Sequence, residues 1–219
     1  MNARAEVHWL KLTNLRRWFM KFRTRHWLFL LLAISTVLIT FTKLVQGLKP
    51  GSVLRTYYHP VRWWLLPHVI TGAIALLAGP FQFSNSLRRQ RPDLHRSIGV
   101  LYIGAIAVSA PLAIIVSLSH VPLVPSLAPI LQAFAWVVAT GMAWLMVRRR
   151  KYIQHQQWMV RSYALTTTFV STRMLFSVPA IDRLNADGSA IVILCPVVCT
   201  LVAAEVGIQI GASESRRQP

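Results

Sequence analysis

The chain alternates between long apolar runs and short polar segments rich in arginine. An α-helix needs about 20 mostly apolar residues to cross the hydrocarbon core of a bilayer, and each run is close to that length. The pattern therefore predicts an all-α fold, a polytopic bundle of about six transmembrane helices. The expected spans are Trp27–Val45, Trp64–Phe83, Ile98–Leu118, Ile130–Val147, Ser162–Ala180 and Ala190–Gly211.

The apolar runs divide the chain into three parts. Residues 27–211 form the transmembrane domain, with its functional core in residues 57–180, and residues 212–219 form a tail. Residues 1–26 combine basic side chains with apolar residues at helical spacing, which indicates either an amphipathic helix on anionic lipids or a solvated basic tail. The apolar residues concerned are Leu12, Leu15, Phe19 and Phe22.

Arginine and lysine are unevenly divided between the two sets of connecting segments. One set of flanks holds most of them, including the run Arg148–Lys151, whereas the other set holds few. Basic flanks stay on the cytoplasmic side, so both termini are expected to be cytoplasmic. Residues 119–129 contain three prolines and no charged residue, and they are predicted to form a short outer loop.

The composition agrees with a membrane protein. Only 14% of the residues are charged, against about 25% in soluble domains. The formal net charge of +18 would suggest nucleic acid as the partner of a soluble chain. Here the basic residues flank apolar runs, so the expected partner is the lipid bilayer and not nucleic acid.

Two histidines are expected at the cytoplasmic ends of spans, His95 before the third and His155 before the fifth. If these helices are neighbours, the two imidazoles lie at similar depth and could hold the iron of haem b from both faces. Arg96 and Arg161 lie close by in sequence and could neutralise haem propionates, and Trp158 could pack on the porphyrin. The alternative is that each histidine is an interfacial side chain with one wet end.

His68 lies just inside the outer end of the second span, after Pro67. Ionisable groups inside a membrane are costly and mark functional sites. The fourth span has no histidine, so the candidate partners of His68 are Gln132 and His120. His68 is therefore a candidate for an outer haem or a quinone-like site.

Arg173 is placed deep in the fifth span, about 16 Å along the helix. A charge at that depth should face the interior and have a partner. One interpretation is a structural pair with Glu205 in the last span. The other is that Arg173 binds an anionic group, either a propionate or an acidic substrate, near the level of His68.

Small residues in the last span permit close packing against another helix or a second copy of the chain. They are Ala203, Gly207 and Gly211. A homo-oligomer is therefore one expected assembly.

The functional core carries an ordered set of motifs. They are His68 with Gly72 and Leu77–Phe83, Leu87–Arg89, Pro92–Arg96 with Gly99 and Tyr102, and His155 with Trp158–Leu165 and Arg173. This set resembles a family of bacterial and fungal membrane proteins catalogued as domain of unknown function 2306, over about residues 57–180. The family is distantly similar, by helix number and histidine placement, to the membrane cytochromes b that hold haem between four helices. The resemblance implies a multi-pass protein of the bacterial cytoplasmic membrane and no established activity.

Two functions follow as hypotheses. In the first, the chain binds haem and transfers electrons, with His95 and His155 as metal ligands and with His68 and Arg173 at an outer haem or quinone-like site. In the second, the chain is a non-enzymatic assembly partner, interaction partner or small-solute carrier, and these side chains hydrogen-bond between helices.

Overall fold

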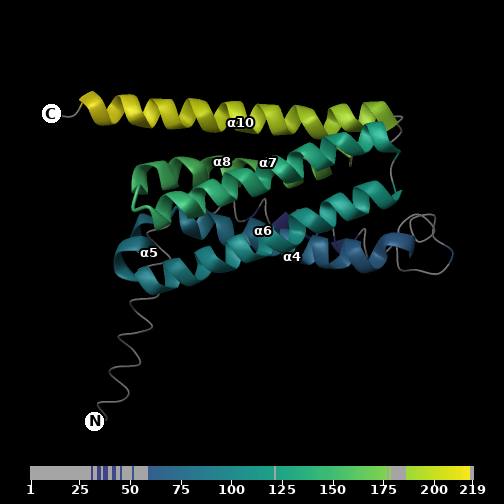
Figure 1. The fold of residues 1–219 in the computed structure, drawn as a ribbon, viewed down its shortest axis with the longest axis horizontal. Helices are drawn as coiled ribbons and strands as arrows, with labels where there is room; N and C mark the ends of the chain where they lie inside the picture. Colours follow the sequence, from purple (N-terminus) through teal and green to yellow (C-terminus); the bar gives the residue numbers. More distant parts are fainter. Residues whose placement is uncertain are drawn as a thin grey trace, which may run out of the picture.

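The computed structural model of the chain is built from helices, which confirms the predicted all-α class for the part that it describes (Figure 1). It describes residues 59–120, 122–176, 178 and 186–217, and a few positions between 31 and 51. The basic segment 1–26 lies outside the described residues. A short 3₁₀ turn, His59–Val61, precedes the first fully described helix. The α-helices are α4 (Arg62–Gln82), α5 (Asn85–Gln90), α6 (Pro92–His120), α7 (Leu123–Arg148), α8 (Tyr152–Leu175) and α10 (Ala186–Arg217).

Four of the described helices are long and apolar enough to cross a membrane. They cover the second, third, fourth and sixth predicted spans, which are therefore confirmed in position. Most of the first predicted span, Trp27–Val45, lies outside the described residues, although its described positions are helical. The four segments are His59–Gln82, Pro92–Ser119, Leu123–Arg148 and Ala190–Ser213.

The fifth predicted span was misplaced. The prediction gave Ser162–Ala180, whereas α8 begins ten residues earlier, at Tyr152, and ends at Leu175. Its first turns carry Gln154, Gln156 and Gln157, which lowered the hydropathy and hid the start of the helix. Because α7 and α10 both end at the same end of the bundle in Figure 1, α8 has to run back between them.

The predicted outer loop and tail are also corrected. Most of residues 119–129 are helical, because α6 runs to His120 and α7 starts at Leu123. The prolines made the start of α7 look like a loop. Proline is nevertheless compatible with the first turn of a helix, because the backbone N–H groups there make no hydrogen bond within the helix. Pro122 is the N-cap of α7, and Pro125 lies in its first turn. The predicted tail, residues 212–219, continues α10 as far as Arg217.

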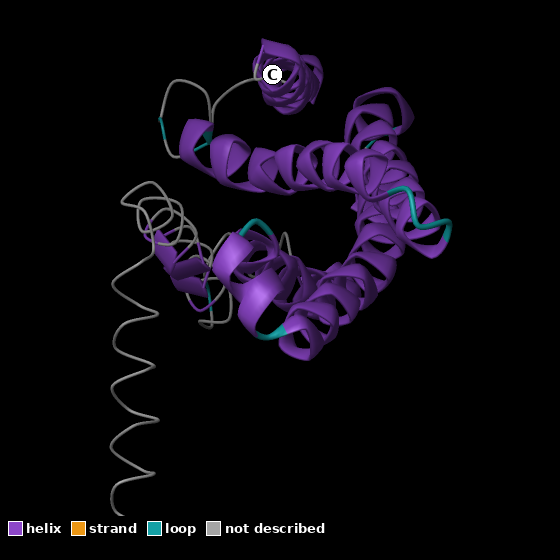
Figure 2. Ribbon diagram, turned by 90° about the vertical axis from the view of Figure 1, so that its left-hand side faces the viewer, coloured by secondary structure: helices purple, strands orange, loops and turns teal. Residues whose placement is uncertain are grey.

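Helices α4, α6, α7 and α8 form a four-helix core. In this core α4 packs on α6, α6 on α7 and α7 on α8, and α8 also contacts α4. Helix α10 packs on α7 and α8 from outside, as Figure 2 shows for the helix that ends at C. Helix α5, the start of α6 and the α7–α8 turn gather at one end (Figure 1). We call this end the basic end, since the arginines of α5 and of Arg148–Lys151 lie there.

The turn between α7 and α8 is short and sharply defined. Arg150 adopts a φ of 60°, a left-handed conformation that is usual for the residue after a helix but costly without glycine. Its N–H donates to the carbonyl of Val147 at 3.0 Å, and the N–H of Lys151 donates to that of Met146 at 2.9 Å. This pair of bonds is a Schellman motif, which closes α7 and directs the chain into α8.

The core lies at the level where α4, α6 and α8 approach one another. Tyr102 of α6 is fully buried and packs with Met159 and Tyr163 of α8. The ring of Tyr163 lies directly against Gly79 of α4, and its hydroxyl donates to the carbonyl of Leu76 at 3.3 Å. The absence of a side chain at Gly79 therefore allows α4 and α8 to meet.

Candidate functional site

The structure brings His95 and His155 together at the basic end. His95 is in the first turn of α6 and His155 in the first turn of α8. The two side chains are close enough to interact electrostatically. Nδ1 of His155 lies 2.8 Å from the carbonyl oxygen of Ala143. Since a carbonyl only accepts, Nδ1 carries a proton, and Nε2 makes no hydrogen bond in the described part of the chain.

His95 has a buried nitrogen without a partner. Its Nδ1 is shielded from solvent and makes no hydrogen bond within the described part of the chain. Buried polar atoms are nearly always paired, so this atom indicates an unmet contact. The backbone carbonyl of His95 accepts a bond from Nε2 of Gln82 at 3.4 Å, which fixes the start of α6 against the end of α4.

The basic end holds two nitrogen atoms of the kind that haem iron takes. Nε2 of His155 and Nδ1 of His95 each lack a hydrogen bond in the described part of the chain, and imidazole nitrogens are common ligands of haem iron. A carbonyl that holds the other ring nitrogen, as Ala143 does here, is the usual support of a metal-binding histidine. Helices α6 and α8 lie diagonally across the core, and the side chains of Tyr102, Met159 and Tyr163 pack between them.

His68 finds its partner on α6. Its Nδ1 lies 2.9 Å from the carbonyl oxygen and 3.0 Å from Oγ of Ser109, and Oγ of Ser109 donates to the carbonyl of His68 at 3.1 Å. Gly72 lies beside this contact, at a position where a Cβ would be in ordinary van der Waals contact with Oγ of Ser109. The predicted partner Gln132 bonds Thr168 instead. The side chain of His120 lies outside the described residues.

Arg173 lies near His68, as predicted. Its positive charge is close enough to act electrostatically on the imidazole of His68. Its guanidinium lies 5.5 Å from the ring centre of Phe169. His95 and Ser109 are fourteen residues apart on α6, so about 21 Å separates the two histidine sites along the bundle. The structure therefore has one pair, His95 and His155, at the basic end and another, His68 and Arg173, toward the opposite end.

A network of hydroxyl groups occupies the core between the two histidine sites. The hydroxyl of Tyr102 lies 2.9 Å from Oγ of Ser162 and 2.9 Å from Oγ1 of Thr166. Thr140 of α7 bonds Ser162 at 2.8 Å, and Nε1 of Trp136 donates to Thr166 at 3.0 Å. These groups are satisfied across three helices, which explains how the polar helix α8 is held in an apolar bundle.

Glu205 pairs with Arg161 and not with Arg173. Nη2 and Nε of Arg161 donate to Oε2 of Glu205 at 2.7 Å and 3.1 Å. The guanidinium also lies 4.9 Å from the ring centre of Trp158. Arg161 begins about 14 Å along α8 and Arg173 about 32 Å along it, so only Arg161 is near the level of Glu205.

Replacing Glu205 with alanine should destabilise the protein by about 2 kcal/mol, between the values for exposed and for buried ion pairs. The reason is that Arg161 would keep its charge beside an apolar wall without its carboxylate. Unfolding by a denaturing detergent measures the effect. The swap of Arg161→Glu with Glu205→Arg should restore at least half of the loss. Equal stability of Glu205→Ala and the parent would show that the pair does not hold α10.

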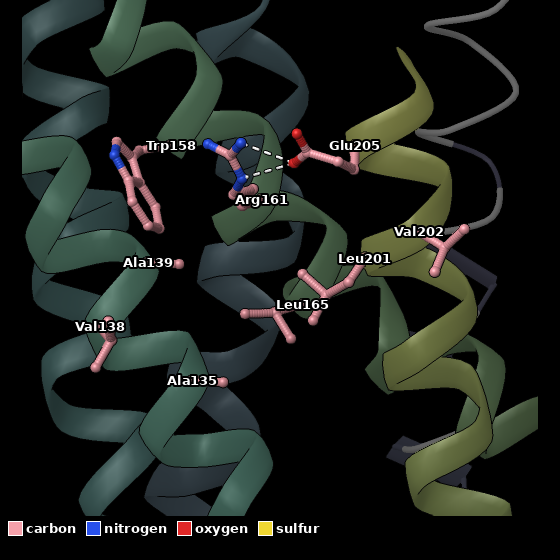
Figure 3. Close-up of a pocket in the computed structure, with 9 residues that line it drawn as sticks. All are labelled: Ala135, Val138, Ala139, Trp158, Arg161, Leu165, Leu201, Val202 and Glu205. Atoms are coloured by element: carbon pink, nitrogen blue, oxygen red, sulfur yellow. Dashed lines mark hydrogen bonds and ion pairs between the residues drawn. The ribbon is translucent and has the colours of Figure 1, made fainter. Parts of the chain in front are cut away.

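A cavity of about 460 Å³ lies between α7, α8 and α10 (Figure 3). Its wall is apolar except where Arg161 and Glu205 face each other at one end. Trp158 closes the same end on the α7 side. The apolar lining residues are Ala135, Val138, Ala139, Leu165, Leu201 and Val202.

The fold and these sites define an integral membrane protein with a polar, histidine-bearing helical core. Residues 65–207 match the family described as predicted membrane protein (DUF2306). The match covers more than half of the chain, so the chain belongs to this family. No curated protein and no solved structure matches the chain. The distant similarity to the membrane cytochromes b is therefore not supported by these comparisons.

Proposed function

We propose that the chain binds haem b at the basic end and transfers single electrons in the membrane. The observation that carries the proposal is the histidine pair of α6 and α8. His155 keeps Nε2 free because Ala143 holds its Nδ1, and His95 has a buried nitrogen without a partner. Haem would supply reversible one-electron chemistry at its iron.

The surrounding residues would set the charge of this site. Arg88 and Arg96 both act electrostatically on His95, and Arg96 also pairs with Asp93 at 3.5 Å, so Arg88 would be the one to neutralise a propionate. Arg161, which the sequence offered for the same role, is held by Glu205. Trp158 packs against the core and also lines the cavity.

The test is an oxidised and a dithionite-reduced absorption spectrum of the full chain, purified in mild detergent after expression with a haem precursor. A sharp reduced α-band with about one haem per chain is the expected result for a bis-histidine site. A featureless spectrum from a folded, monodisperse sample would overturn the proposal.

The second candidate is a non-enzymatic membrane protein, either an interaction partner or a small-solute carrier. The hydroxyl network favours it, because Tyr102, Ser162, Thr140 and Thr166 satisfy one another and need no cofactor. Such networks serve helix packing in many membrane proteins. A featureless spectrum would make this the better function, and Arg173 would be the first residue to replace.

A further inference from the structure

The cavity between α7, α8 and α10 is polar at one end only. Its volume of about 460 Å³ falls within the roughly 300–1,000 Å³ of small-molecule sites. Arg161 and Glu205 lie toward the basic end, whereas Leu165 and Leu201 lie one turn farther from it (Figure 3). A molecule with a polar head and an apolar tail, oriented like the lipids around it, matches this gradient.

The ion pair leaves one donor and one acceptor for such a head. Both bonds from Arg161 end on Oε2 of Glu205, so Nη1 and Oε1 have no bond in the described part of the chain. The two charges neutralise each other, and a phosphate or carboxylate would be repelled by Glu205 while it approached Arg161. An uncharged head with carbonyl or hydroxyl oxygens can use both groups.

The wall beside the ion pair is flat. Trp158 presents its indole between the cavity and the core, and the guanidinium of Arg161 lies 4.9 Å from the ring centre. Aromatic faces favour planar partners in offset or edge-on contact. The polar end therefore suits a flat ring that carries oxygen atoms.

We propose that this cavity binds a quinone-type lipid. Its carbonyl oxygen would accept from Nη1 of Arg161, the hydroxyl of its reduced form would donate to Oε1 of Glu205, and its tail would lie along Leu165 and Leu201. The sequence placed a quinone-like site at His68 and Arg173, whereas the lining of this cavity contains neither of these residues. Binding at this site does not require haem.

The test is a titration of the full chain in detergent with a decyl-substituted benzoquinone, followed by quenching of tryptophan fluorescence. Leu201 points toward Leu165 across the cavity, so Leu201→Trp puts an indole where the tail would lie (Figure 3). It should raise Kd about tenfold or more, which corresponds to about 1.4 kcal/mol. Val198→Trp is the control, since it lies on the same helix, does not line the cavity and is 59% exposed. Its Kd should equal that of the parent.

Two further arms keep the outcome decisive. Leu201→Phe adds a smaller ring, so it is the milder variant and should weaken binding by a smaller factor if Leu201→Trp fails to fold. Decanoate and decylphosphocholine, which have tails of the same length, should not displace the quinone at equal concentration. Equal effects of the Leu201 and Val198 variants, or displacement by either amphiphile, would overturn the proposal.

Discussion

His155→Ala is expected to lower the haem content at least about tenfold, since even the loss of a supporting contact to a metal-binding histidine costs 10–100-fold in affinity. His155 would be an axial ligand, and its Nδ1 is already committed to Ala143. His95→Ala should give the same loss. Haem per chain, measured as the pyridine complex after purification, reads out both variants.

His59→Ala is the control for these variants. His59 is exposed in the turn before α4, and it should keep the haem content of the parent. His68→Ala tests whether the haem content depends on the other end of the bundle. It removes the partner of Ser109 and leaves the basic end intact, so the haem content should equal that of the parent. Full haem content in both His95→Ala and His155→Ala would rule out the assigned ligands, even if the parent binds haem.

Gly79→Ala is expected to destabilise the protein by about 1–3 kcal/mol, the range found when a packed core receives an extra carbon. A Cβ at this position would overlap the ring of Tyr163. That ring cannot move aside easily, because its hydroxyl bonds the carbonyl of Leu76 and its face lies 5.5 Å from Phe83. Detergent-driven unfolding measures the loss.

Gly104→Ala is the matched control for this substitution. Gly104 is also inside a helix, but no atom lies within 4 Å of a Cβ built there. Alanine should therefore stabilise α6 by about 0.5–1 kcal/mol through its helix propensity. In the Gly79→Ala background, Tyr163→Ala should cost less than it does in the parent, since it removes the overlap. Additive effects would show that Gly79 and Tyr163 do not constrain each other.

Hydropathy predicted the apolar helices well, and it predicted α8 poorly for a physical reason. Helices that face lipid or an apolar core are apolar themselves, so α6 and α7 were found from composition alone. Helix α8 instead buries Ser162, Thr166 and Thr168, whose hydroxyls bond polar side chains of α6 and α7. A sum of single-residue hydropathies cannot register that these groups satisfy one another in the bundle.

The sequence predicted a contact correctly where the depth of the two residues along the bundle determined it. Alternating spans bring the first turns of α6 and α8 to one end, so the approach of His95 and His155 followed from topology. The choice of Ser109 as the partner of His68 depends on how α4 and α6 are rotated about their axes. A single sequence does not give this rotation. The pairing of Glu205 was misjudged between Arg161 and Arg173 because the start of α8 was set ten residues too late.

The short turn at Arg150 bears on how the chain enters the membrane. Helix α8 is too polar to be favoured in lipid by itself, since each unsatisfied polar group in hydrocarbon costs several kcal/mol (about 2–7). Gln132, Trp136 and Thr140 of α7 bond its hydroxyls, beside Tyr102 of α6. Helices α7 and α8 would therefore be inserted together as one hairpin, with the Schellman turn at Arg150 retained on the basic side.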